Sequence, residues 1–185
     1  DGGWRDLDKT VAEALQRDGV PTLGVDSLRY FWSAKSAGTV AGDLSAAIAT
    51  YTARWKVSKV ILIGYSFGAD ILPAAYNRLG HADQAAVKEI SLLGFARQAD
   101  FEISVAGWLG SHSGEAAPTL PEVKRLPASL LQCFYGEDED DTACPDLRPL
   151  GAEIIRTGGG HHFDGDYDAL AAQILAGFRK RAGNL

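Results

Sequence analysis

The stretch from Val60 to Gly68 reads VILIGYSFG and sets a serine between two glycines directly after an apolar run. Four β-favouring residues precede the first glycine, and residues 69–72 continue as a first helical turn. A serine at the apex of a strand-to-helix turn is typical of a nucleophile elbow, because small residues two positions before and after it permit the tight bend. The pattern therefore predicts that Ser66 is a catalytic nucleophile.

The overall composition is that of an ordinary globular protein, with 46% hydrophobic and 23% charged residues in 185. This length is enough to bury a sizeable core, and we expect a single domain over residues 1–185. The net charge of −6, without a basic run, argues against nucleic acid as a partner. The apolar stretches are too short for a bilayer span, so no transmembrane segment is expected.

Apolar periodicity predicts alternating helices and strands along the chain. Helices are expected over 7–18, 40–51, 69–79 and 169–178, and strands over 20–25, 59–63, 90–95, 130–135 and 153–156. The alternation, with strands apolar on both faces, predicts an α/β fold with a mostly parallel sheet covered by helices on both sides. Residues 97–127 are the expected excursion from this sheet. The chain begins in a loop, so the prediction allows for early strands that are absent from it.

A base and an acid for Ser66 follow it in the order that α/β-hydrolases use, which is serine, acid, histidine. A serine hydroxyl needs such a base before it can attack. His161 and His162 follow a glycine run after the last strand, and five carboxylates at 137–141 follow the preceding strand. The pattern Gly-His-x-Phe favours His161 as the base and leaves His162 to packing or a supporting hydrogen bond. The reverse assignment of the two histidines stays open at this point.

An oxyanion hole needs two backbone N–H donors aimed at the developing charge. The amide of Phe67, directly after the nucleophile, is the first predicted donor. The second is expected from the glycine loop at the start of the chain, at Asp1 or Gly2, because glycine lets the backbone approach a substrate closely. This chemistry needs no metal ion and no organic cofactor.

The two cysteines, Cys133 and Cys144, stand eleven positions apart. This spacing matches no zinc pattern, and no second pair of cysteines could complete one. The residues alone leave a short-loop disulfide and two unrelated thiols as equal alternatives. A disulfide would indicate an oxidising compartment such as a bacterial periplasm.

Over nearly its whole length the chain resembles the VirJ family of bacterial virulence proteins and the related C-terminal domain of AcvB, in the α/β-hydrolase superfamily. The segments that carry the resemblance are 1–4, 30–32, 64–70, 99–103, 107–110, 133–136 with Cys144, and 160–167. The family differs at the front, where its loop has further residues and a strand before Asp1. That difference weakens the link between Asp1 or Gly2 and the oxyanion hole.

The resemblance implies an α/β-hydrolase-like fold and a periplasmic serine hydrolase. Within the acidic run it implies Glu139, three positions past the glycine at the strand end, as the acid, with Asp138, Asp140 and Asp141 as close alternatives. It also implies a disulfide between Cys133 and Cys144.

The substrate implied by the resemblance is lysyl-phosphatidylglycerol, an aminoacylated phospholipid at the membrane surface. The family is also linked to virulence and to type IV secretion, so secretion-system or secreted proteins are possible partners. Two other functions fit the same sequence. One is a non-catalytic periplasmic module that binds or escorts secretion substrates, and the other is a carboxylesterase, thioesterase or peptidase of different specificity. Carboxylesterases, thioesterases and peptidases of this fold share the same serine, base and acid, so these residues do not distinguish their substrates.

Overall fold

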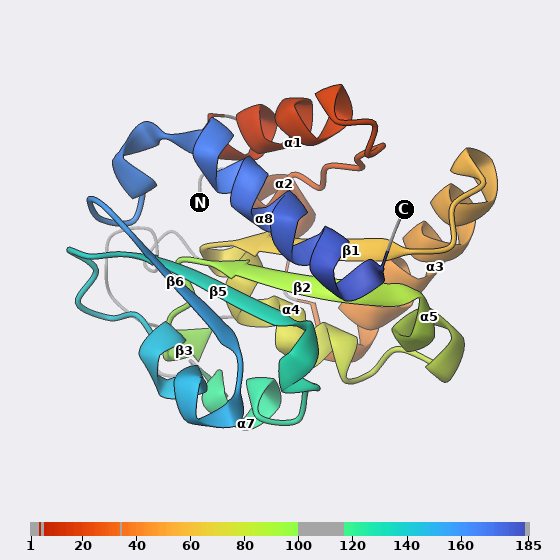
Figure 1. Cartoon of the computed structure of the whole chain (residues 1–185). Coiled ribbons are helices and arrows are strands. Elements are labelled where there is room, and N and C mark those ends of the chain that lie inside the picture. The colour runs from red at the N-terminus through yellow and green to blue at the C-terminus, as the bar shows by residue number, and fades with distance from the viewer. Residues whose placement is uncertain (1–3, 5, 34, 100–116, 184–185) are drawn as a thin grey trace.

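A parallel sheet forms the centre of the protein (Figure 1). The computed structural model describes residues 4, 6–33, 35–99 and 117–183. Within them, four strands pair in the order β1-β2-β5-β6, and all three pairings are parallel. These strands are β1 (Val60–Tyr65), β2 (Val87–Leu93), β5 (Leu131–Gly136) and β6 (Glu153–Thr157). A second pair, β3 (Gln98–Ala99) and β4 (Ala117–Pro118), is antiparallel.

Helices cover both faces of the sheet, because successive side chains of each strand point to opposite sides. Leu62 and Leu92 pack toward α3 (Ala37–Trp55) and α4 (Phe67–Tyr76). Tyr65, Leu93 and Phe134 pack on the other face, toward α1 (Leu7–Arg17) and α8 (Tyr167–Ala182). Figure 1 shows α1 and α8 together on that face. The predicted α/β sandwich of helices around a parallel sheet is confirmed.

Short polar side chains mark where several helices begin. Ser36 accepts a hydrogen bond from the Thr39 amide at the start of α3, and Asp166 accepts one from the Ala169 amide at the start of α8. The shorter elements are α2 (Ser27–Tyr30), α5 (His81–Ala86), α7 (Leu120–Val123), η1 (Ala128–Leu130), η2 (Cys144–Leu150) and η3 (Phe163–Gly165). No helix in the described ranges combines the length and the apolar character needed to cross a membrane.

The strand predicted over 20–25 is wrong. These residues form an extended segment without strand pairing. Pro21 has no N–H to donate to a ladder, and a Cβ atom at Gly24 would collide with the ring of Trp4. In the part of the chain that the structure describes, β1 pairs only with β2, so its other edge offers this segment no bonded neighbour. Local β propensity alone did not make a strand here.

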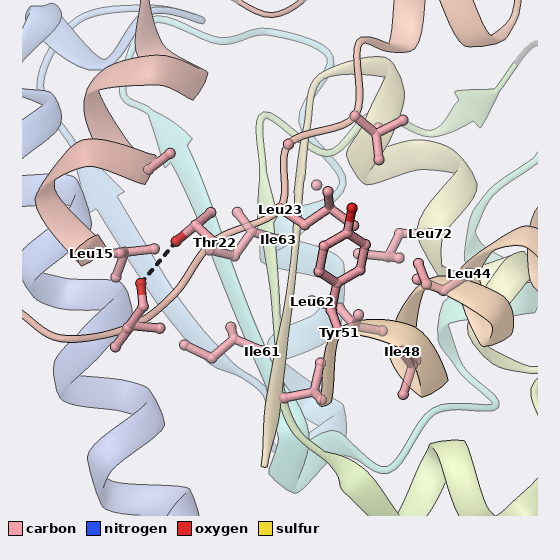
Figure 2. Close-up of a pocket in the computed structure, with 18 of the residues that line it drawn as sticks. Leu15, Thr22, Leu23, Leu44, Ile48, Tyr51, Ile61, Leu62, Ile63 and Leu72 are labelled. Atoms are coloured by element: carbon pink, nitrogen blue, oxygen red, sulfur yellow. Dashed lines mark hydrogen bonds between the residues drawn. The ribbon is translucent and has the colours of Figure 1, made fainter. Parts of the chain in front are cut away.

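A cavity of about 710 Å³ lies along the open edge of β1 (Figure 2). Ile61, Leu62 and Ile63 all line it, although they alternate between the two faces of the sheet, so the cavity surrounds the edge of the strand. Leu23, from the extended segment, lines it as well. An edge strand presents a row of backbone N–H and C=O groups that an apolar ligand cannot pair.

A disulfide joins Cys133 in β5 to Cys144 at the start of η2. Both residues are fully buried in the core on the α3 and α4 side of the sheet. The pairing is the one that the family resemblance implied. The disulfide ties η2, which follows the acidic loop at 137–141, to β5, which precedes that loop.

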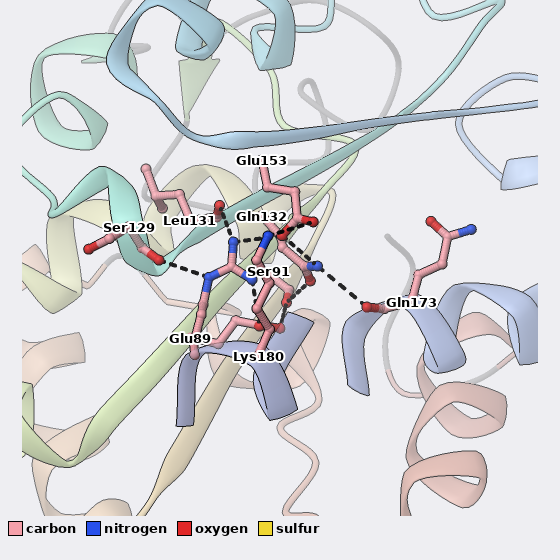
Figure 3. A network of polar contacts seen from close by, with 9 residues as sticks. Glu89, Ser91, Ser129, Leu131, Gln132, Glu153, Gln173 and Lys180 are labelled. Carbon is pink, nitrogen blue, oxygen red and sulfur yellow. Dashed lines mark hydrogen bonds and ion pairs between the residues drawn. The ribbon is translucent and has the colours of Figure 1, made fainter. Parts of the chain in front are cut away.

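A polar network crosses the amino-terminal half of the sheet and holds the last turn of α8 to it (Figure 3). The Arg181 guanidinium contacts Glu89 at 3.2 Å and Glu153 at 2.7 Å. It also donates to the main-chain oxygens of Ser129 and Leu131. Glu89 is fully buried, and this burial raises its pKa to about 7.

Arg181→Met should lower the free energy of unfolding by about 3 kcal/mol or more, because it leaves the buried Glu89 carboxylate without its cation. Urea denaturation measures the change. Arg179→Met, on the exposed side of the same helix, is the matched control and should change stability little. Adding Glu89→Gln to Arg181→Met should restore part of the loss. An undiminished loss in the double variant would contradict this account.

Candidate active site

Ser66 sits at a tight turn between β1 and α4, with φ 53° and ψ −122°. Non-glycine residues rarely adopt a positive φ, so the surrounding structure must hold this conformation. The Ser66 amide donates to the Leu93 carbonyl of β2 at 2.8 Å. A Cβ atom on Gly64 would lie 2.5 Å from the Gly68 carbonyl oxygen, which explains why the turn needs a glycine there. The structure thus has the tight strand-to-helix turn at Ser66 that the sequence predicted.

The imidazole of His161 faces this serine, with Nε2 2.8 Å from Ser66 Oγ. His161 belongs to the loop after β6, and the neighbouring Phe163 is buried against α8 and anchors that loop in the core. The Asp164 carboxylate folds back over Gly158 and Gly159, so close that side chains at these two positions would collide with it. The glycine run thus forms a defined loop that presents the histidine.

Glu139 holds the far side of the same imidazole. Its Oε1 lies 2.5 Å from His161 Nδ1, and its Oε2 accepts the Gly136 amide at 2.9 Å. The side chain of Glu139 is 11% exposed and that of His161 is 37% exposed, so the carboxylate lies deeper than the ring. Both carboxylate oxygens have donors, which fixes the orientation of the group that holds the imidazole.

The loops that carry the acid and the histidine also bind each other through the main chain. The amide of Glu137 donates to the Thr157 carbonyl at 2.9 Å, and the amide of Asp138 donates to the Gly159 carbonyl at 2.9 Å. A Cβ atom on Gly136 would collide with the Gly160 carbonyl oxygen. The two loops therefore act as one unit, and the separation of Glu139 and His161 depends on that packing.

The remaining predicted acids lie away from this contact. Asp138, Asp140 and Asp141 are exposed, and Asp141 forms an ion pair with Arg97 at 3.7 Å. Glu137 is an ion-pair partner of Arg156 at 2.9 Å. Among the five carboxylates of the run, the structure brings Glu139 to the imidazole.

His162 has a different partner from His161. Its Nδ1 lies 3.0 Å from the hydroxyl of Tyr65. Of the two histidines, the structure therefore places His161 between Ser66 and Glu139.

The predicted oxyanion donors are described only in part. Phe67 occupies the first position of α4, so its amide belongs to the positive end of that helix. Asp1 and Gly2 lie outside the described residues. The same holds for most of the segments 99–103 and 107–110 that contributed to the family resemblance.

Sequence reasoning missed a glycine that the site requires. Gly94 directly follows β2 with φ +62°, and a Cβ atom there would lie 2.7 Å from His161 Cε1 and 2.9 Å from Nδ1. Only a residue without a side chain lets the end of β2 pass so close to the imidazole. The available signal was a glycine at the end of the apolar run 90–93.

Asp70 is a second residue whose role was not predicted. It lies in the first turn of α4, partly buried, and its Oδ1 accepts the Ala96 amide at 2.8 Å. Burial raises the pKa of Asp70 to about 7, although the Ala96 hydrogen bond and the nearby His161 act in the opposite direction. Asp70 therefore fixes the strand end that carries Gly94 to the helix that follows Ser66.

Comparison with known proteins gives the chain a family. Residues 1–182 match the family described as bacterial virulence protein (VirJ). The chain belongs to the VirJ family. No curated protein sequence matches it closely enough to count as a relative.

Two solved structures resemble this VirJ-family chain along almost all of its length. One is a hydrolase candidate of the alpha/beta superfamily from Xanthomonas campestris pv. campestris, with 15% identity, a TM-score of 0.58, and coverage of 95% of this chain and 93% of the other. The second is a hydrolase candidate from Agrobacterium vitis S4, with 13% identity, a TM-score of 0.50, and coverage of 94% and 82%. At these identities the likeness shows the fold, which is that of the α/β-hydrolases.

Asp70→Asn should stabilise the protein more at pH 8 than at pH 5. The raised pKa means that the folded state binds a proton at pH 5 that the unfolded state has largely lost, so the parent loses stability as the pH rises toward 7. Asparagine keeps an acceptor for the Ala96 amide and carries no charge. The gain in free energy of unfolding should be larger at pH 8 by roughly 1–2 kcal/mol.

Chemical denaturation at the two pH values measures this difference. Asp138→Asn, at an exposed carboxylate of the acidic loop, is the matched control. An equal effect of Asp70→Asn at both pH values would show that the Asp70 carboxylate does not titrate in this range.

Proposed function

We propose that this VirJ-family protein is a serine ester hydrolase in which Ser66 is the nucleophile, His161 the general base and Glu139 the acid that orients it. The observation that carries the proposal is the continuous relay from Ser66 Oγ through both nitrogens of His161 to Glu139. Nucleophile, base and orienting carboxylate in hydrogen-bond contact are the arrangement that activates a serine hydroxyl. The α/β-hydrolase fold and the order of the three residues in the chain support it.

The reaction follows from this geometry in two stages. Ser66 Oγ attacks the ester carbonyl carbon while its proton moves to His161 Nε2, and Glu139 stabilises the imidazolium that forms. The carbon–oxygen bond to the alcohol then breaks, and the alcohol oxygen takes the proton from His161. A water molecule, deprotonated by His161, then attacks the carbonyl carbon of the ester on Ser66. The bond from that carbon to Ser66 Oγ breaks, the acid is released, and His161 returns the proton to Ser66 Oγ.

The Phe67 amide is the proposed first donor to the oxyanion. It follows the nucleophile directly and lies at the positive end of α4, where a developing negative charge is stabilised. Asp1 and Gly2 stay the proposed source of the second donor.

The proposed substrate is the aminoacyl ester of lysyl-phosphatidylglycerol, whose lysyl group would be transferred to Ser66 and released as lysine. Membership of the VirJ family supports this choice, and so does the charge around the site. Asp138, Asp140 and Asp164 are exposed on the two loops that carry the acid and the base. A lysyl group has two ammonium groups, and carboxylates at the rim would orient it.

The periplasm is the proposed location. A disulfide between fully buried cysteines persists in oxidising compartments and is rare in the cytosol. Through the lipid composition of the membrane, the activity would be linked to virulence and to type IV secretion, as expected for the family.

Ser66→Ala should abolish depletion of lysyl-phosphatidylglycerol in detergent micelles, with a fall in rate of at least about a thousandfold, because no nucleophile remains. Lipid mass spectrometry follows the substrate. Ser58→Ala, at an exposed serine before β1, is the matched control and should keep the parent's rate. Labelling with a fluorophosphonate should mark the parent and the control but not Ser66→Ala. Labelling without lipid turnover would retain the hydrolase and overturn the substrate, whereas a parent that does not label would support a non-catalytic binding module.

Glu139→Gln should reduce turnover by roughly a hundredfold or more, because the amide cannot stabilise the imidazolium as the carboxylate does. Asp140→Asn removes a carboxylate from the same loop without touching His161 and should change turnover less than about threefold. Steady-state kinetics on a soluble ester without an ammonium group compares the two, so that the proposed role of Asp140 toward a lysyl group does not enter the comparison. A larger loss of turnover in Asp140→Asn than in Glu139→Gln would show that Glu139 is not the orienting acid.

A further inference from the structure

Tyr65 stands immediately before the nucleophile and touches both histidines of the base loop. Its ring stacks on that of His161, with centroids 5.2 Å apart and planes inclined by 28°. Its hydroxyl lies 3.2 Å from the main-chain oxygen of His161 and 3.0 Å from Nδ1 of His162. The residue is almost fully buried, whereas His162 is exposed.

The number of protons decides how these two contacts can both be hydrogen bonds. A phenol has one proton to donate, and a carbonyl oxygen can only accept. The Tyr65 hydroxyl must therefore donate to the His161 carbonyl. The contact with His162 is then a hydrogen bond only if Nδ1 of His162 carries a proton and donates it to the phenol oxygen.

We propose that Tyr65 and His162 are positioning residues for His161, in which the protonated Nδ1 of His162 donates to the Tyr65 hydroxyl and that hydroxyl donates to the main-chain carbonyl of His161. This inference rests on the proposed function, since it assigns His161 the role of the base. Burial raises the pKa of Tyr65, which keeps the phenol neutral and able to donate.

The relay from His162 through Tyr65 holds the main chain of His161, whereas Glu139 and Ser66 hold its ring. Glu139 and Ser66 bind the two ring nitrogens of His161, and Tyr65 binds its backbone. If His162 carried its proton on Nε2 alone, its Nδ1 would accept the phenol proton and the His161 carbonyl would lose its donor. The tautomer of the second histidine therefore determines how the first is held.

Tyr65→Phe should slow fluorophosphonate labelling of Ser66 about three- to tenfold, because the stacked ring stays and the hydrogen bonds are lost. His162→Ala should slow labelling by a similar factor. His162→Asn, which places an amide donor near the position of Nδ1, should restore the parent's rate to within about twofold. In the double variant Tyr65→Phe/His162→Ala the two effects should not add, since both break the same relay.

The kinetics of soluble-ester hydrolysis distinguish positioning from a general loss of structure. Tyr65→Phe and His162→Ala should lower kcat with KM unchanged, and His162→Asn should restore kcat to within about twofold of the parent. Equal losses in His162→Ala and His162→Asn would overturn the proposal. Because His162 is exposed, its variants test the relay even if Tyr65→Phe does not fold.

A measurement of the tautomer is independent of activity. Nitrogen-15 spectra of the parent with labelled histidines should show the proton of neutral His162 on Nδ1, whereas a proton on Nε2 alone would refute the relay. This readout stands even if Ser66 proves inert, so failure of the relay and failure of the proposed hydrolase can be told apart.

Discussion

Ser66 keeps a positive φ between β1 and α4, and the rest of the site is arranged around that strained turn. The Leu93 carbonyl of β2 accepts the serine amide, while Gly64 lets α4 begin directly against the strand. Parallel pairing then brings the carboxyl ends of β2, β5 and β6 to the same edge of the sheet. His161 contacts Ser66, and Glu139 contacts His161, because the loops that carry them leave the sheet at this edge.

Different kinds of polar contact hold the two ends of the sheet: side-chain ion pairs at one end and main-chain hydrogen bonds between loops at the other. At the amino-terminal half, Arg181 and its buried partners hold α8 against the strands, and no chemistry is proposed there. At the carboxyl edge, backbone hydrogen bonds join the acid loop to the histidine loop, so Glu139 and His161 keep their separation without relying on long flexible side chains. The disulfide reinforces this edge, because it ties η2, just after the acid loop, to β5. The Arg181 network thus stabilises the fold at the end of the strands opposite to the proposed catalytic residues.

Features that depend on local spacing could be predicted from the sequence. The glycines around Ser66, the apolar runs of β1, β2 and β5, and the order of serine, acid and histidine all belong to this class. The choice of acid could not be read in the same way, because the five carboxylates at 137–141 are similar in type and the turn after β5 decides which one meets His161. Gly94 and Asp70 were missed since their importance arises from packing between strand ends far apart in the chain. The segment 20–25 has the composition of a strand, but among the described residues no strand pairs with it.

The measurement that tests the central claim most directly is rapid acid quenching of the protein during turnover of lysyl-phosphatidylglycerol, followed by peptide mass spectrometry. The account predicts a lysyl group esterified to Ser66, in an amount that Ser66→Ala abolishes. Glu139→Gln should lower the rate at which that group appears. A fatty acyl group on Ser66, or a turning-over enzyme with no adduct at this serine, would contradict the account.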